Sequence, residues 1–209
     1  YILKEKEFWS KKFEINESTL VPRPETELML EKLIKIYKEK KINILDIGTG
    51  SGCILISLLS ELKNSIGVGI DISTEALKIA KKNAKKHKID DKIFFYNKSF
   101  TEIYERKFDL IVSNPPYIRN CDIEKLSPEV KKFDPFLALN GGKDGLECYR
   151  IISKSAKKYL NPGGLICVEI GNNQSSEVKK IFNTVGFQIY KDHKDYSNIR
   201  RVMIFKNKI

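Results

Sequence analysis

The chain has few of the residues that build metal centres and disulfide frameworks. Its four cysteines are scattered and form no Cys-x-x-Cys pair, and its two histidines, His87 and His193, stand far apart. A zinc site or a histidine-based triad therefore has no visible basis, and we expect no metal. Scattered cysteines also favour a reducing, cytoplasmic setting.

Long hydrophobic runs are missing as well. No apolar stretch approaches the roughly 20 residues that span a bilayer, and no signal peptide is visible, so we expect no membrane association. The chain begins at Tyr1 and not at Met, and we expect it to belong to a longer protein. At 209 residues, with 41% hydrophobic and 31% charged residues, it fits one globular domain with an extension.

Arginine is scarce although the net charge is +11. Only six arginines occur, so lysine supplies most of the positive charge. Specific readout of nucleic acids usually relies on arginine forks. We interpret the diffuse lysines as a solvated surface and expect no stable nucleic-acid complex, although the charge leaves an RNA or DNA partner open.

A strand, a glycine-rich loop and a helix follow one another near residue 50. The β-branched run Ile42–Ile47 predicts the strand, Gly48-Thr49-Gly50-Ser51-Gly52 the loop, and Cys53–Leu62 the helix. This order is typical of the first unit of a nucleotide-binding α/β fold. Glycines let the backbone approach a ligand closely, and the helix N-terminus offers free N–H groups.

An acid closes the next predicted strand, Ser65–Ile70. Asp71 lies 23 residues after Gly48, close to the spacing of about 20 expected for a ribose-binding carboxylate. The alternative is an acid at a helix start, since Ser73 suits the N-cap of a helix running to about Lys88. Beside a glycine loop, we favour the ribose role.

The segment Asn114-Pro115-Pro116-Tyr117 follows another predicted buried strand, Phe108–Ser113. The two prolines remove backbone donors and fix φ near −65°. The Asn114 side chain and the carbonyls of Asn114 and Pro115 remain as acceptors, which suit a planar NH2-bearing group. The alternative is a plain proline-rich turn. Ligands of such sheets lie where the strand order reverses, so we expect Asn114 and the glycine loop to face one crevice.

The remaining pattern predicts an alternating α/β chain. Residues 1–20 read as a short hairpin or extended arm, and 118–143 as a long connection with little periodicity, typical of a lid. The other expected strands are Lys92–Tyr96, Leu165–Ile170 and an antiparallel closing pair, Phe187–Tyr190 and Arg201–Phe205. The other expected helices begin near Glu25, cover Asp144–Leu160 before an Asn-Pro-Gly-Gly stop, and cover Ser175–Val185.

Taken together, these segments resemble a class I S-adenosylmethionine (SAM) methyltransferase acting on a planar nitrogen. The stretch from Val21 to Glu27, Val-Pro-Arg-Pro-Glu-Thr-Glu, narrows the resemblance, as do Phe133-Asp134-Pro135 and Gly141–Leu146. The chain is similar to the HemK/PrmC family, the protein-(glutamine-N5) methyltransferases of peptide chain release factors. The family implies a Rossmann-like, mostly parallel seven-stranded sheet with an antiparallel last strand.

The resemblance also implies ligands and roles. The cofactor would be SAM, with S-adenosylhomocysteine as the product. The substrate would be the glutamine of the Gly-Gly-Gln loop in class 1 release factors. We expect the protein to be a monomer. Asn114, Pro115 and Tyr117 would be catalytic, and with Pro116 they would hold the glutamine amide. The cofactor would be bound by Gly48, Thr49, Gly50, Ser51, Gly52, Asp71, Ser99 and Asn114.

Two departures from the family pattern stand out. The family usually has an acid near Lys98, so contact with adenine would here pass to Ser99 or to a backbone group. The family also has a small N-terminal helical domain, which 1–209 lacks, and Tyr1-Ile2-Leu3 resembles the linker after it. We therefore divide the chain into an arm, 1–20, and a catalytic domain, 21–209.

Two other functions stay open at this point. The acceptors around Asn114 would serve an adenine-N6 methyltransferase on DNA or RNA equally well, although no separate target-recognition domain is apparent. The chain could also be a non-catalytic SAM- or RNA-binding module, although binding alone would not need Asn-Pro-Pro-Tyr.

Overall fold

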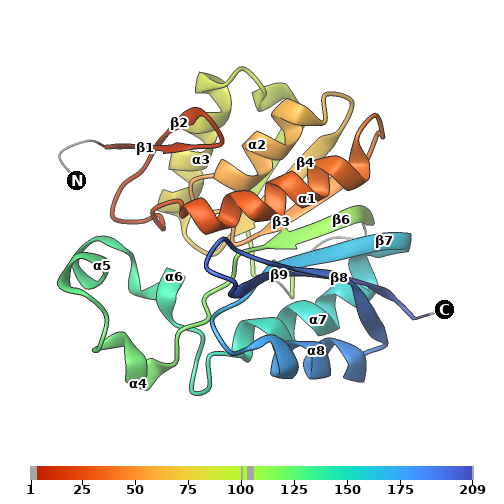
Figure 1. Ribbon diagram of the computed structural model, residues 1–209. Coiled ribbons are helices and arrows are strands. Elements are labelled where there is room, and N and C mark those ends of the chain that lie inside the picture. The colour runs from red at the N-terminus through yellow and green to blue at the C-terminus, as the bar shows by residue number, and fades with distance from the viewer. Residues whose placement is uncertain (1–3, 100, 103–105, 209) are drawn as a thin grey trace.

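The computed structural model describes residues 4–99, 101–102 and 106–208. Seven strands form one sheet in the order β5-β4-β3-β6-β7-β9-β8 (Figure 1). Every neighbouring pair is parallel except those that involve β9, which runs antiparallel to β7 and β8. The strands are β3 (Asn43–Ile47), β4 (Ile66–Asp71), β5 (Ile93–Asn97), β6 (Phe108–Ser113), β7 (Leu160–Glu169), β8 (Phe187–Lys194) and β9 (Arg200–Asn207). The predicted sheet, with its antiparallel last strand, is confirmed.

Helices cover both faces of the sheet (Figure 1). Successive strand residues point to opposite faces, so Ile44 packs in one core cluster and Leu45 in the other. The first cluster includes α1 (Glu27–Tyr37) and α2 (Cys53–Glu61), with Ala84 of α3 (Thr74–Lys86). The second includes α7 (Glu147–Tyr159) and α8 (Ser175–Thr184). With both faces covered, the parallel strands can be apolar throughout.

The strand order reverses between β3 and β6. β3 pairs in parallel with β4 on one side and with β6 on the other, so the chain winds outward in both directions from this pair. The loops after β3 and β6 therefore leave the same edge of the sheet side by side. This is the predicted switch point, and it brings the glycine loop and Asn114 to one place.

A hairpin precedes the sheet. Its strands are β1 (Glu5–Phe8) and β2 (Lys11–Glu14), and both Phe8 and Phe13 are buried. Asn83 of α3 accepts from the Glu14 amide and donates to the Glu14 carbonyl. The expected hairpin within 1–20 is confirmed, while residues 1–3 lie outside the described residues and the division at residue 20 stays a prediction.

The helix expected over Asp144–Leu160 is shorter than its pattern suggested. Residues 144–146 form a turn in which the Leu146 amide donates to the Asp144 carboxylate, and Gly145 has a φ of +75°. At the other end, residues 160–164 belong to β7. The helix ends at Tyr159, and β7 begins directly after it: Leu160 pairs with Phe108, and the Asn161 side-chain Nδ2 donates to Asp109 Oδ1 at 2.7 Å.

The 118–143 connection contains three short helices: α4 (Asn120–Ile123), α5 (Pro128–Phe133) and α6 (Phe136–Leu139). None is long enough to show a helical period in the sequence. Ser127 caps α5, with Pro128 in its first turn. The two ends of the segment meet, because Ile118 pairs with Asn140 and accepts from the Gly141 amide at 2.8 Å.

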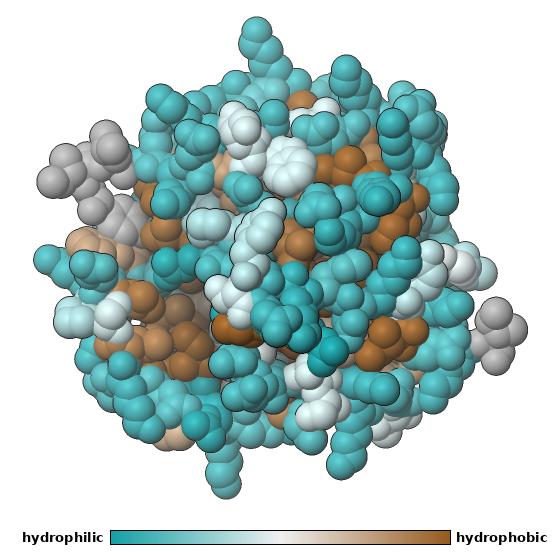
Figure 2. All heavy atoms as spheres, viewed as in Figure 1, coloured by the Kyte–Doolittle hydropathy of each residue, from teal (hydrophilic) through white to brown (hydrophobic). Residues whose placement is uncertain are grey.

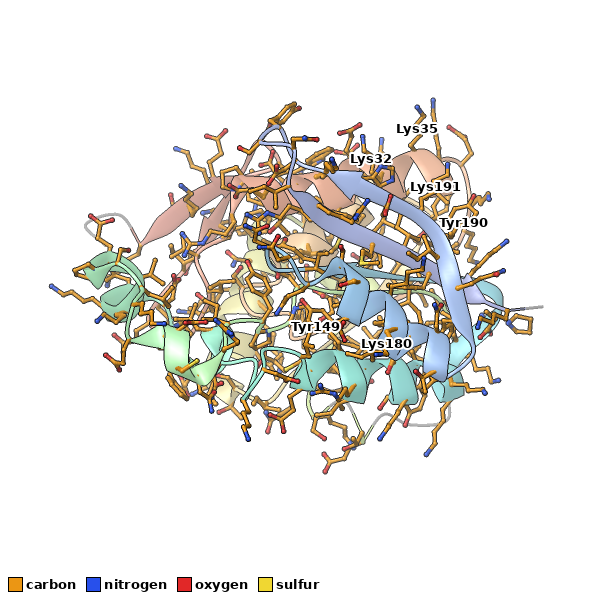
Figure 3. The ribbon with its side chains drawn as sticks, turned by 60° about the horizontal axis from the view of Figure 1, so that its bottom comes forward. Lys32, Lys35, Tyr149, Lys180, Tyr190 and Lys191 are labelled. Carbon is orange, nitrogen blue, oxygen red and sulfur yellow. The ribbon has the colours of Figure 1, made fainter. Side chains whose placement is uncertain are left out.

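The outer surface carries the lysines. Figure 3 shows Lys32 and Lys35 of α1 on the same outer side as Lys191 of β8, while Tyr149 of α7 lies inside. No helix in the described part of the chain is both long and apolar enough to cross a membrane.

Candidate active site

A cavity of about 620 Å³ lies at the carboxyl edge of β3, β4 and β6. Figure 2 shows a hollow bordered by hydrophobic residues beside α6. Of the residues predicted to form the site, it is lined by Gly48, Thr49, Gly50, Ser51, Asp71, Ser99, Asn114 and Pro116. Gly52, Pro115 and Tyr117 do not line it; Pro115 is buried and Tyr117 is half-buried beside it.

Asp71 holds the glycine loop in place. Its carboxylate accepts from the Gly50 and Ser73 amides, both at 2.9 Å. Gly50 has a φ of +55°, a conformation in which glycine is favoured. Burial raises the pKa of Asp71, and the two amide donors oppose that shift. Each carboxylate oxygen accepts more than one hydrogen bond, so the predicted ribose contact stays possible and stays a prediction.

Asp46 supports the same loop and was missed as a functional residue. It is fully buried at the end of β3, and the Thr49 hydroxyl donates to its Oδ2 at 2.7 Å. Its Oδ1 has no hydrogen-bond partner among the described residues. Burial raises the pKa of Asp46 to about 7.

Asn114 is tied to a second buried acid. Its Nδ2 donates to Thr26 Oγ1 at 3.3 Å, and Thr26 Oγ1 donates to Glu169 Oε2 at 2.6 Å. The Tyr117 hydroxyl reaches the other oxygen of Glu169 at 3.5 Å. Glu169 is only 2% exposed, and burial raises its pKa to about 7. Burial likewise raises the pKa of Tyr117.

Sequence reasoning missed Thr26 and Glu169 as site residues. Thr26 lay inside a motif that was used only for the family resemblance. Glu169 carried a usable signal, because it is a single acid that ends a buried apolar strand. Asp46 and Asp71 carry the same signal on β3 and β4.

Hydrogen bonds and close backbone packing hold the loop after β6 in place. Gln174 Nε2 donates to the carbonyls of Tyr117 and Gly145, at 3.0 and 3.1 Å. A Cβ at Gly141 would lie 2.8 Å from Tyr117 Cα, so only glycine lets the two backbones approach this closely. The Tyr149 hydroxyl donates to the Glu169 carbonyl at 2.9 Å from the interior position seen in Figure 3.

An ion pair closes another side of the cavity. Arg23 Nη2 lies 2.5 Å from Asp134 Oδ2, and the Val21 amide donates to Asp134 Oδ1 at 3.0 Å. Asp134 thereby fixes the segment before α1, and Arg23 and Pro135 both line the cavity.

The loop after β5 contributes Ser99. Its hydroxyl lies 2.8 Å from that of Thr101, and both residues line the cavity. Asn97 steadies the loop by donating to the carbonyls of Asp71 and Ile72. Phe100 lies outside the described residues, and the contact of Ser99 with adenine stays a prediction.

The arrangement suits ligand positioning. Residues of the glycine loop, Asp71 and Asn114 line one cavity, which fits a nucleoside next to an NH2-bearing group. Among the described residues, no three His, Cys, Asp or Glu side chains gather where they could hold a metal ion.

Comparison with known proteins agrees with this geometry. Residues 38–205 match the family model of a methyltransferase domain. A release factor glutamine methyltransferase of Fusobacterium nucleatum subsp. nucleatum is 44% identical over the whole of this chain and 60% of its own length. Another, of Agrobacterium fabrum, is 40% identical over 98% of this chain and 73% of its own length. The chain belongs to the release factor glutamine methyltransferase family.

Membership of the release factor glutamine methyltransferase family confirms the resemblance seen in the sequence. The chain spans only 43% of the length of some curated relatives, such as the bifunctional methyltransferase of Rickettsia prowazekii. A solved structure of the hMettl16 catalytic domain superposes with a TM-score of 0.75 at 16% identity, covering 94% of this chain and 76% of that one. That likeness confirms the class I methyltransferase fold.

Proposed function

We propose that the protein transfers a methyl group from SAM to the side-chain amide nitrogen of a glutamine, that of the Gly-Gly-Gln loop in class 1 release factors. The observation that carries this proposal is the single cavity lined by both the glycine loop and Asn114. Family membership supports the choice of a glutamine amide over an adenine.

The cofactor half of the cavity fits SAM. In our proposal the glycine loop Gly48–Gly52 lies against its amino-acid end, Asp71 accepts from the ribose hydroxyls, and Ser99 lies against the adenine. When bound, SAM supplies a sulfonium methyl group that is already electrophilic. The residues of this half therefore need only to bind and orient the donor, with S-adenosylhomocysteine as the product.

The other half must improve a poor nucleophile, because the lone pair of an amide nitrogen is delocalised into its carbonyl. We assign the Asn114 side-chain oxygen and the Pro115 carbonyl as acceptors for the two amide hydrogens. Both hydrogen bonds strengthen as positive charge grows on the nitrogen, so they favour the transition state. Tyr117 packs beside the amide plane, and the proton leaves to water.

We also propose that the enzyme acts as a monomer in the cytoplasm, without a stable nucleic-acid complex. The cysteines support a reducing compartment, since Cys53, Cys121, Cys148 and Cys167 are all free. Size-exclusion chromatography with light scattering tests the monomer.

One assay separates the candidate functions. Labelled SAM is offered with a class 1 release factor, with its Gly-Gly-Gln Gln→Ala variant, and with DNA or RNA. Label on the wild-type factor alone is the expected result. Label on nucleic acid would point to the adenine-N6 reaction, and no transfer in any arm would point to a binding module.

A further inference from the structure

The hydrogen bonds that run from Glu169 through Thr26 to Asn114 have a single direction when Glu169 is ionised. An ionised carboxylate only accepts hydrogen bonds. A threonine hydroxyl has a single hydrogen, and Thr26 donates it to Glu169 Oε2 at 2.6 Å. Thr26 can therefore only accept from Asn114, and it does so from Nδ2 at 3.3 Å.

This direction determines how the Asn114 amide is turned. With Nδ2 engaged by Thr26, Oδ1 lies on the other side of the amide group. In the described part of the chain, no protein group donates to Oδ1, and Asn114 lines the cavity. A flipped amide would place NH2 hydrogens against the hydrogens of a substrate NH2 group, which is repulsive.

We propose that Glu169 and Thr26 are positioning residues, which turn the acceptor end of the Asn114 amide toward the cavity. The inference rests on the proposed function, in which Asn114 Oδ1 accepts a hydrogen of the glutamine amide. Thr26 lines the cavity and Glu169 does not. Glu169 acts on Asn114 through Thr26, which lies 143 residues from Glu169 and 88 residues from Asn114 in the sequence.

The ordinary role for Thr26 would be a helix cap. Thr26 lies between the 3-10 turn η1 (Pro24–Thr26) and α1, yet its side chain makes no capping hydrogen bond. The hydroxyl is committed to Glu169, and Thr26 is only 2% exposed. The buried pair therefore serves Asn114 and not the helix start.

The direction depends on the charge of Glu169. Arg201 of β9 favours the charged form, and Glu25 of η1 opposes it. The Tyr117 hydroxyl reaches Oε1, and Thr26 donates to Oε2. A neutral side chain with its own hydrogen, as in protonated Glu169 or in Glu169→Gln, could donate to Thr26 and let the whole chain of bonds reverse.

The test compares Thr26→Val, Thr26→Ser and Glu169→Gln in the full-length protein, assayed with SAM and a class 1 release factor. Val has the shape of Thr without the hydroxyl, and Ser keeps the hydroxyl. Ser113→Ala is the matched control. Its buried hydroxyl donates to the Ile47 carbonyl at 2.8 Å one residue before Asn114, and lies outside this set of bonds.

We expect kcat to fall about tenfold or more in Thr26→Val and in Glu169→Gln, the effect of one lost, well-oriented hydrogen bond. The KM for SAM should change by less than about threefold, because the glycine loop is untouched. Thr26→Ser should restore kcat, and Ser113→Ala should keep it. Wild-type kcat in Thr26→Val, no rescue by Ser, or an equal loss in Ser113→Ala would overturn the inference.

An NMR measurement that does not depend on catalysis distinguishes a failure of this inference from a failure of the proposed function. In the wild type, the side-chain 15N resonance of Asn114 should titrate with the Glu169 carboxyl near pH 7, and in Thr26→Val it should not. An Asn114 signal indifferent to Glu169 would overturn the inference. A wild-type protein that transfers no methyl group to the release factor would refute the proposed function, whatever the resonance shows.

Discussion

The cavity has two halves, and each rests on a buried acid with a threonine. In the cofactor half, Thr49 donates to Asp46 at 2.7 Å, across three residues of sequence. In the Asn114 half, Thr26 donates to Glu169 at 2.6 Å, across 143 residues. Both carboxyls have a pKa raised to about 7 by burial. In both pairs a threonine hydroxyl donates to a buried carboxyl. The pairs differ in the origin of the partners and in the second carboxyl oxygen, which in Asp46 has no partner among the described residues and in Glu169 is reached by the Tyr117 hydroxyl.

The difference shows how each half is assembled. The cofactor half is a local turn that forms within one strand-loop-helix unit. The Asn114 half needs the start of α1, the end of β6 and the end of β7 to meet. We therefore expect changes in the first half to alter SAM binding and changes in the second to alter the rate of transfer.

The largest effect is expected from Asn114→Ala, which removes the acceptor of the second half. Turnover should fall by at least about 100-fold, as for the loss of one preorganised hydrogen-bonding group in an active site. The fold should be largely kept. Labelled methyl transfer and circular dichroism measure the two. Near wild-type methylation by purified Asn114→Ala would contradict the proposed mechanism.

Asp71→Ala should have the opposite profile. It releases the Gly50 and Ser73 amides, so the glycine loop and the start of α3 each lose one charge-assisted hydrogen bond. We expect the Kd for SAM to rise about 10- to 100-fold, from 1.5–3 kcal/mol for such bonds. At saturating SAM, kcat should change much less. A large fall in kcat with an unchanged Kd for SAM would contradict the assignment of SAM binding to one half of the cavity and of the transfer rate to the other.

Asp134→Ala tests how much the contact between the 118–143 segment and the segment before α1 contributes to the stability of the fold. Asp134 is buried, binds Arg23 and accepts from the Val21 amide, so its loss strands a donor and a charge. We expect the free energy of unfolding to fall by about 1–3 kcal/mol, measured by urea denaturation. Asp122→Ala is the control, because its ion pairs with Arg119 and Lys125 are exposed and their loss should cost much less.

The smallest effect concerns pH. In the folded protein Asp46 and Glu169 keep their protons up to about pH 7, whereas their ordinary pKa values are 3.8 and 4.5. The folded state then binds more protons than the unfolded state in this window, so their contribution to stability falls as pH rises from about 4.5 to 7. Glu169→Gln should flatten that fall by on the order of 1 kcal/mol. A steeper fall in the variant would show that the Glu169 pKa is lowered.

The local features could be predicted from the sequence, because one short stretch determines each. The strand Phe108–Ser113 has its predicted bounds, and Ser73 caps α3 as expected, with its Oγ accepting from the Ala76 amide. The meeting of the glycine loop with Asn114 followed from a general rule of strand order.

The features that could not be predicted from the sequence depend on residues that lie far apart in the chain. Nothing near Thr26 in the sequence indicates Glu169, because α1 and β7 are brought together only by the finished sheet. The sequence indicates that the helix stops before the Asn-Pro-Gly-Gly run, but not that β7 already begins at Leu160, which pairs with Phe108 of β6. Helices of four to six residues, such as α4 and α5, leave no period to detect.

The two ends of the 118–143 segment are joined to each other, so the length of chain between them does not change the position of Asn114. Ile118 and Gly141 are joined by a hydrogen bond of 2.8 Å, so the chain enters and leaves through a single point behind Tyr117. Beyond that point Pro135, Leu137, Ala138 and Asn140 line the cavity and Asp134 tethers the segment, whereas α4 and α5 contribute no residue to the lining. To present a different peptide to the same methyl donor, α4 and α5 should be varied, while the hydrogen bond between Ile118 and Gly141 and the contacts of Asp134 are kept.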